Sequence, residues 1–149
     1  MISLKKCSPF QPEVSKLIDE LDAYQGTLYP PASNYHDSRE ILNQPNCHFI
    51  AAYEDEEICG IGAVKLFDHY GEIKRVYVPV KARGKGIAQI IVKELENFLL
   101  QREINLIRLE TGIHHLDAIN LYHKLGYVRT SVFGDYTNDP LSVFMEKKI

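Results

Sequence analysis

The segment Lys81–Ala88, KARGKGIA, places three cations and two glycines directly before a strongly periodic apolar segment. After Gly86 the apolar residues fit one face of a 3.6-residue helix: Ile87, Ile91, Val92, Leu95, Phe98 and Leu99. The turn therefore leads into a helix N-terminus, where unpaired N–H groups and the helix dipole attract anions. With Arg83 and Lys85 adding charge, it suits a phosphate or pyrophosphate. The alternative is a plain strand–helix turn with solvated cations.

Two common nucleotide-binding motifs do not match this turn. A Walker A loop needs Ser or Thr after its Gly-Lys pair, but Gly86 follows Lys85 here. The G-x-G-x-x-G fingerprint follows the first strand of a βαβ unit, whereas Gln89 occupies its third glycine position and antiparallel strands are expected before the turn. The residues alone thus indicate an anion site and argue against both nucleotide motifs.

The composition is that of an ordinary globular protein. The chain has 149 residues, 45% hydrophobic and 25% charged, which predicts one domain over residues 1–149. A net charge of -3 argues against a general nucleic-acid binder. No stretch approaches the roughly 18 apolar residues of a membrane span, and no signal peptide is expected. Three scattered cysteines without zinc spacing favour a reduced, cytoplasmic compartment: Cys7, Cys47 and Cys59.

Residue periodicity predicts antiparallel strands followed by alternating helices and strands. Strands are expected at 1–7, 48–53, 57–67, 72–78, 105–111 and 141–148, and helices at 11–24, 38–42, from 87 onward and at 116–127. The charged turns EDEE and DHYG make the second, third and fourth strands antiparallel neighbours. This order predicts an α/β protein with a mixed sheet.

Three motifs resemble the GCN5-related N-acetyltransferases, the GNAT family. RGKGIA is similar to the family pattern R/Q-x-x-G-x-G/A, with Arg83, Gly86 and Ala88 in the defining positions. IKRVYVPVKA resembles the family's fourth strand, and AINLYHKLGY its A-x-x-L-Y-x-x-x-G-F/Y helix. The resemblance implies a GNAT fold, with antiparallel N-terminal strands and a splayed parallel pair, Arg75–Val78 and Leu106–Glu110, in a mixed sheet flanked by helices.

The resemblance also implies acetyl-CoA as cosubstrate. Its pyrophosphate would lie on the backbone amides of Arg83, Gly84, Lys85, Gly86, Ile87 and Ala88, and its pantetheine arm would pair with Val76, Tyr77 and Val78. One position departs from the family: an asparagine that often contacts the cofactor is replaced by His115. No metal is expected, because adjacent His114 and His115 would point to different faces.

For catalysis, the resemblance implies acetyl transfer to a primary amine by direct attack in a ternary complex. Tyr122 matches the family tyrosine that protonates the departing CoA thiolate, and a phenol with a pKa near 10 suits that task. The alternative for Tyr122 is simple packing, since it shares an apolar face with Ala118 and Leu125.

The general base is expected to be a carboxylate that acts directly or through water. Glu72, at the start of the fourth strand, is the first choice, and Glu110, at the end of the fifth, is the second. The amide of Val76 or Tyr77 would hold the developing oxyanion.

The acceptor is expected to be a small-molecule amine or a protein amine. The loops QGTLYPPASNYHDS and FGDYTNDP are expected to line the acceptor pocket, and their Tyr and Asp side chains suit a cationic amine. The alternative is that both are ordinary solvated loops. A homodimer is compatible with the resemblance. Two other classes stay open: a non-catalytic acyl-CoA-binding or regulatory domain, and a nucleotide- or phosphate-binding module.

Overall fold

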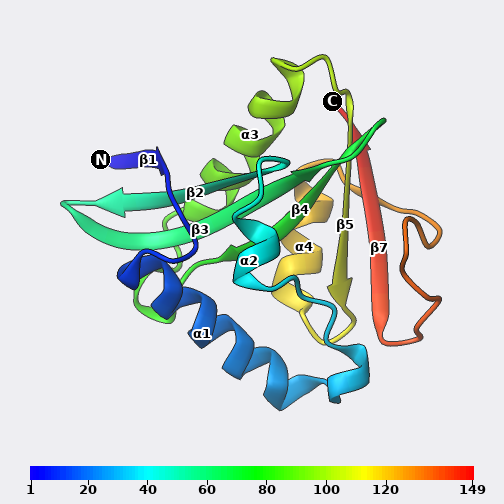
Figure 1. Cartoon of the computed structure of the whole chain (residues 1–149). Helices are drawn as coiled ribbons and strands as arrows, with labels where there is room; N and C mark the ends of the chain where they lie inside the picture. Colours follow the sequence, from blue (N-terminus) through cyan, green and yellow to red (C-terminus); the bar gives the residue numbers. More distant parts are fainter.

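The computed structural model describes residues 1–149 as one seven-stranded mixed sheet flanked by helices (Figure 1). The strands are β1 Ile2–Lys6, β2 Cys47–Glu54, β3 Glu57–Leu66, β4 Gly71–Tyr77, β5 Leu106–Gly112, β6 Val128–Arg129 and β7 Ser142–Lys148. The helices are α1 Pro12–Leu28, α2 Arg39–Leu42, α3 Ile87–Leu100 and α4 Leu116–Lys124, with short 3-10 turns at Pro31–Ser33 and Val80–Ala82. The strand order is β1-β2-β3-β4-β5-β7-β6.

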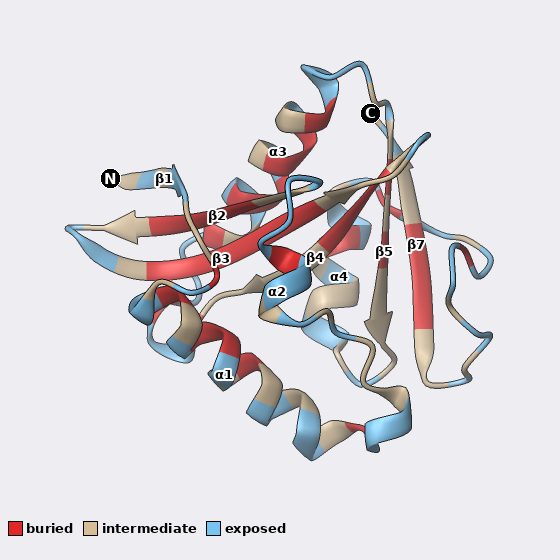
Figure 2. Ribbon diagram, in the orientation of Figure 1, coloured by how far each residue is buried: buried red, intermediate tan, exposed pale blue.

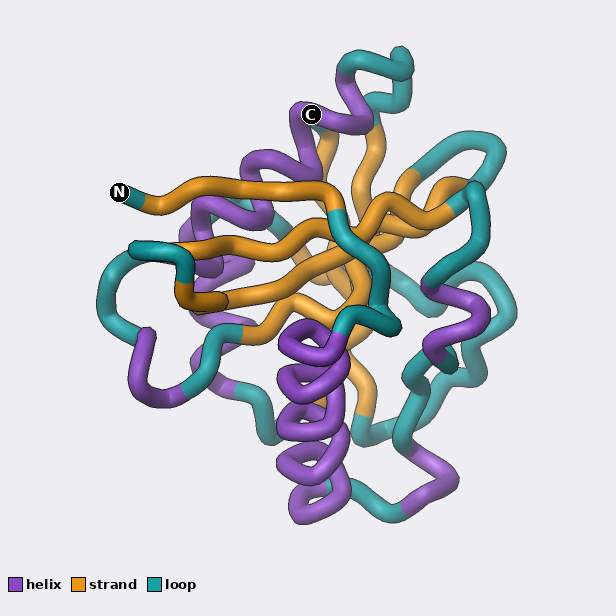
Figure 3. The backbone as a smooth tube through the Cα atoms, turned by 60° about the vertical axis from the view of Figure 1, so that its left-hand side comes forward, coloured by secondary structure: helices purple, strands orange, loops and turns teal.

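Strand alternation builds two separate cores on the two faces of the sheet. Along β2, Phe49 and Ala51 belong to the core that contains α1 and α2, whereas Ile50 and Ala52 belong to the larger core under α3 and α4. Figure 2 shows the buried stripes of α1 and α3 facing the strands between them. In the turned view of Figure 3, α1 lies in front of the strands and α3 passes behind them.

The predicted mixed sheet, with antiparallel N-terminal strands and one parallel pair, is confirmed. The first helix is longer than expected, because α1 continues through Gly26 to Leu28 and only the following Pro30 and Pro31 end it. The segment from residue 25, predicted as loop, therefore begins inside a helix. The two-residue β6 was not predicted, since so short a strand has no readable alternation. None of the helices is both long and apolar enough to cross a bilayer.

The parallel strands β4 and β5 stay together for only two residue pairs. Gly71 pairs with Ile107 and Glu72 with Arg108, and no further pair follows. On the other edge of β4, the register with β3 shifts, because Lys74 faces Ala63 while Tyr77 faces Ile61. Two residues of β4, 75 and 76, thus oppose Gly62 of β3 in a β-bulge. Such a bulge bends its strand, here β4 away from β5.

The packing behind this bulge gives a stability prediction for Gly62. A Cβ at this position would lie 2.5 Å from Ile91 Cγ2 and 3.2 Å from Val76 Cγ2. We expect Gly62→Ala to lower the free energy of unfolding by about 1–3 kcal/mol through overpacking, measured by urea denaturation. Gly26→Ala is the matched control, because nothing lies within 4 Å of its Cβ position in α1. Equal midpoints for the two variants would contradict this packing.

Candidate functional site

Three adjacent hollows follow the gap between β4 and β5. The β4 groove, about 450 Å³, lies between the end of β4, the glycine turn and α4. The central cavity, about 120 Å³, lies in the gap itself, and the outer cavity, about 470 Å³, opens between β3, β4 and the loops at 34–37 and 134–137. The central cavity shares Val76, His115 and Tyr122 with the groove, and Asp37, Lys74 and Tyr136 with the outer cavity. Two ligands entering from opposite sides would therefore meet at the central cavity.

The glycine turn has the geometry of an anion-binding helix start. Gly84 and Gly86 both adopt left-handed conformations, with φ of 86° and 75°, and Gly86 is the N-cap residue of α3. No heavy atom lies within 4 Å of a Cβ built on either glycine, so the space in front of the turn is open. Ile87 begins the helix and is buried in the core, which fixes the turn to the sheet.

The cations of the turn are not all directed at this space. Arg83 lines the β4 groove and its Nε donates to the Val78 carbonyl at 2.9 Å. Lys85 instead forms an ion pair with Glu54 at 2.7 Å, on the side of the β2–β3 hairpin. Of these two cations, Arg83 and not Lys85 therefore lines the groove.

The end of β4 offers a free strand edge to the same groove. Val76, Tyr77 and Val78 line it, together with Ala88 at the start of α3. Because pairing with β5 ends at Glu72, the β5-side backbone groups of these three residues have no strand partner. An extended ligand with amide groups can pair with such an edge as an added strand.

Tyr122 lies where the groove meets the central cavity. It is 5% exposed and its hydroxyl makes no hydrogen bond within the protein. Its ring packs edge-to-face on Tyr127 at 5.4 Å, and Tyr127 is held by its own hydrogen bond to Glu96. Burial raises the pKa of Tyr122, so the phenol keeps its proton at neutral pH.

Glu110 faces the same central cavity as Tyr122. It accepts a hydrogen bond from Ser142 Oγ at 2.7 Å across the β5–β7 ladder. Burial raises the pKa of Glu110 to about 7, against the lowering effects of the Ser142 hydrogen bond and the Lys74 charge. A carboxyl group with this pKa exchanges protons readily at neutral pH.

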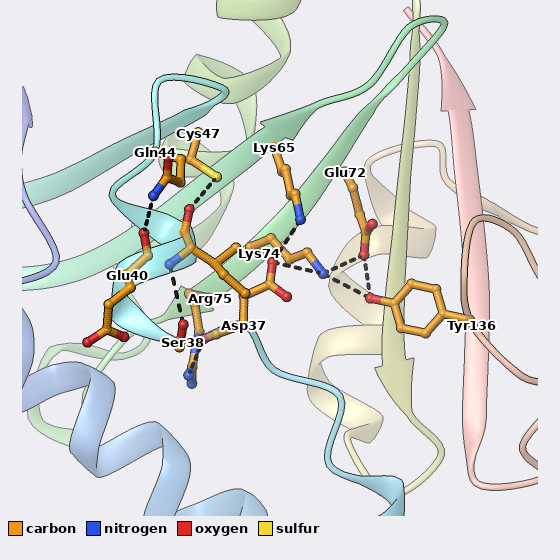
Figure 4. A network of polar contacts seen from close by, with 11 residues as sticks. Asp37, Ser38, Glu40, Gln44, Cys47, Lys65, Glu72, Lys74, Arg75 and Tyr136 are labelled. Atoms are coloured by element: carbon orange, nitrogen blue, oxygen red, sulfur yellow. Dashed lines mark hydrogen bonds and ion pairs between the residues drawn. The ribbon is translucent and has the colours of Figure 1, made fainter.

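Glu72 has a different setting, which Figure 4 shows. It is 3% exposed, accepts a hydrogen bond from the Tyr136 hydroxyl and forms an ion pair with Lys74 at 2.9 Å. It lines the outer cavity and not the central one. No sequence pattern indicates that Tyr136 would bond this carboxylate, because Tyr136 comes from a loop more than sixty residues away.

His115 is positioned by Tyr29, which follows the C-terminal end of α1 and is far from it in the sequence. The Tyr29 hydroxyl accepts the His114 backbone N–H at 2.9 Å and lies 2.9 Å from His115 Nδ1. Gly112 makes room for it, since a Cβ there would lie 1.9 Å from the hydroxyl oxygen. His115 Nε2 is buried without a partner in the protein, and the residue lines both the groove and the central cavity.

The two loops predicted to wall a pocket do line the outer cavity, but most of their acids are already bonded. Asp37 lies 3.6 Å from Lys65 Nζ and 3.7 Å from Lys74 Nζ (Figure 4). Asp139 accepts hydrogen bonds from Ser33 and Tyr35. The wall therefore carries paired charges, so the surplus of negative charge expected for binding a cationic amine is largely neutralised within the protein. No cluster of three or more His, Cys, Asp or Glu side chains is arranged to hold a metal ion.

Comparison with known proteins assigns the family. The model of the acetyltransferase (GNAT) family matches residues 15–127. The "IAA acetyltransferase" of Azospirillum brasilense is 36% identical over 150 residues, covering 99% of this chain and 98% of that protein. A crystal structure described as an acyl-CoA N-acyltransferase from Klebsiella pneumoniae is also 36% identical, with a TM-score of 0.84 over 99% of this chain and 97% of its own.

A more distant structure supports the fold alone. It is a GNAT acetyltransferase from Elizabethkingia anophelis with acetyl-CoA bound, 19% identical, with a TM-score of 0.71 over 99% of this chain and 98% of that one. The predicted fold and the expected class of enzyme are thus confirmed. The chain belongs to the GNAT family of acetyltransferases, enzymes that use acetyl-CoA.

Proposed function

We propose that this enzyme transfers the acetyl group of acetyl-CoA to a primary amine, by direct attack in a ternary complex. The observation that carries the proposal is the central cavity, where Tyr122 and Glu110 face one space between the β4 groove and the outer cavity. The cosubstrate would occupy the groove and the amine would enter through the outer cavity. That cavity, of about 470 Å³, accommodates a small-molecule amine or the tip of a protein chain.

The residues of the β4 groove suit two parts of acetyl-CoA, the charged pyrophosphate and the amide-containing pantetheine arm. The backbone N–H groups of residues 83–88, helped by the Arg83 side chain, would hold the pyrophosphate at the positive end of α3. Val76, Tyr77 and Val78 would bind the pantetheine arm through the unpaired strand edge. The left-handed glycines and the open space before them support this assignment.

His115 would supply one more donor to the arm, in place of the asparagine that many relatives use. Burial and the neighbouring His114 lower the pKa of His115, so its ring is neutral. Tyr29 accepts the His114 N–H and keeps its proton, so its hydroxyl would donate that proton to Nδ1. In that arrangement the hydrogen of the neutral ring would be on Nε2, the buried atom that has no protein partner.

In the transfer step, Tyr122 would protonate the departing thiolate and Val76 N–H would hold the negative charge that develops on the thioester oxygen. The geometry favours Glu110 over Glu72 as the base. Glu110 faces the cavity that contains Tyr122 and has a pKa of about 7, whereas Glu72 is occupied by Lys74 and Tyr136 and faces only the outer cavity. Glu72 would then hold Lys74 and Tyr136 in place.

Ligand-induced stabilisation tests the cofactor assignment. A hundredfold excess over Kd stabilises the folded state by about 2.7 kcal/mol, so acetyl-CoA and CoA should raise the melting temperature while ATP and NAD do not. We expect Arg83→Ala combined with Gly86→Asp to abolish the shift, because a carboxylate would face the pyrophosphate. The control is Lys81→Ala, which removes a cation paired with Glu57 outside the groove. An undiminished shift in the double variant would rule out the pyrophosphate site, and CoA binding without CoA release from any amine would favour a non-catalytic domain.

The acid role of Tyr122 predicts a loss in kcat rather than in binding. We expect Tyr122→Phe to lower kcat at least about tenfold, as for loss of a positioned general acid, with little change in acetyl-CoA affinity. Tyr53→Phe, on β2 and away from the three hollows, should behave as wild type. Full turnover by Tyr122→Phe would leave this residue with a packing role only.

The pH profile separates the two carboxylates as base. A base must be ionised to accept the amine proton, so kcat/KM for acetyl-CoA should rise with pH through the Glu110 pKa of about 7 and then level off. We expect Glu110→Gln to lower kcat about a hundredfold and to remove this inflection, and Glu72→Gln to retain it. Loss of the inflection in Glu72→Gln, with its retention in Glu110→Gln, would assign the base to Glu72 instead.

A further inference from the structure

One residue inside a strand has a backbone conformation that L-amino acids rarely adopt. Four non-glycine residues have positive φ: Asp55, Glu56, Glu103 and Arg75. The first two form the β2–β3 turn and Glu103 follows the end of α3, where such angles are common. Arg75, with φ of 59°, is in the middle of β4. A conformation this uncommon persists only where surrounding contacts hold it, and such residues cluster at functional sites.

The side chain of Arg75 shows what holds it. It is 5% exposed, and its Nη1 forms an ion pair with Asp22 on α1. Its Nη2 donates to the Asp37 backbone carbonyl at 3.2 Å, in the loop that walls the outer cavity. A buried guanidinium is costly without such partners, so these two contacts fix the position of Arg75 between α1, β4 and the loop.

The conformation of Arg75 determines where the next amide points. The peptide unit between residues 75 and 76 carries the Val76 N–H, and its orientation depends on the backbone angles of Arg75. This unit lies in the bulge opposite Gly62, at the point where β4 has left β5. Both Arg75 and Val76 line the central cavity.

We propose that the Arg75–Asp22 ion pair is a positioning device for the oxyanion site. It holds the β4 bulge so that Val76 N–H faces the thioester oxygen in the central cavity. The inference rests on the proposed function, because it gives Val76 its role there. Arg75 and Asp22 are positioning residues, since they act through the backbone of β4 and not on the reacting atoms.

Asp22→Asn tests the positioning role of the Arg75–Asp22 ion pair without changing a residue of β4. Displacing a catalytic donor by a fraction of an ångström costs one to two orders of magnitude in rate, so we expect kcat to fall about tenfold or more with the KM for acetyl-CoA within about twofold. Asp19→Asn is the matched control, because it breaks an Arg–Asp pair from the same helix to α2 and leaves β4 untouched. Equal kcat values for these two variants would overturn the proposal.

A second variant, Arg75→Gly, tests whether the backbone conformation of residue 75 matters without the ion pair. Glycine adopts the Arg75 angles without cost, so Arg75→Gly would equal or exceed the wild-type kcat if conformation alone mattered. Because the proposal requires the ion pair, we expect Arg75→Gly also to lose about tenfold or more in kcat. A fully active Arg75→Gly would overturn the proposal.

An NMR readout keeps this test separate from that of the proposed function. In the wild-type protein, the Val76 amide resonance should differ between the acetyl-CoA and CoA complexes, because only acetyl-CoA carries the thioester oxygen. The difference should shrink by about half or more in Asp22→Asn and persist in Asp19→Asn. No difference in the wild type would remove the oxyanion role of Val76, and with it the inference. A difference retained in Asp22→Asn would remove only the ion-pair device.

Discussion

The site depends on one interruption in the sheet: β4 and β5 pair for two residues and then separate. Backbone N–H and C=O groups away from water need partners, so an unpaired edge in the middle of a sheet is costly unless a ligand or solvent satisfies it. At this point β4 carries the bulge opposite Gly62, and Ile91 packs close behind that glycine. The same separation makes the free edge of the β4 groove and the space of the central cavity.

Glu72 and Glu110, the two carboxylates near this gap, differ in their bonding partners and surroundings. Glu72 is buried, but Lys74 and Tyr136 compensate its charge, so it is a fixed part of the wall. Glu110 is bonded only by Ser142 and faces a cavity, so burial dominates and its pKa rises to about 7. Proteins commonly place neighbouring carboxyl groups in different environments, so that one has a structural role and the other an acid–base role.

Much of the fold could be predicted because local patterns determine it. Alternation in β2 and β3, the helical spacing after Gly86 and the glycine turn all depend on residues near in sequence. The same holds for the position of Tyr122 on α4. The hydrogen bond from Tyr136 to Glu72 could not be predicted, because Tyr136 reaches it from a distant loop. Nor does any sequence pattern indicate that Arg75 adopts a left-handed conformation, since that depends on α1 and on the register of β3.

Asp37 connects the two sides of the reaction space. Its carboxylate lies between Lys65 and Lys74 at the outer cavity, while its backbone carbonyl accepts the Arg75 hydrogen bond behind the central cavity. Lys74 in turn forms its ion pair with Glu72. The loop that lines the outer cavity is therefore bonded to the residue that precedes Val76. The charges of Asp37, Lys65, Glu72 and Lys74 in this wall therefore compensate one another within one network that joins the loop to β3 and β4.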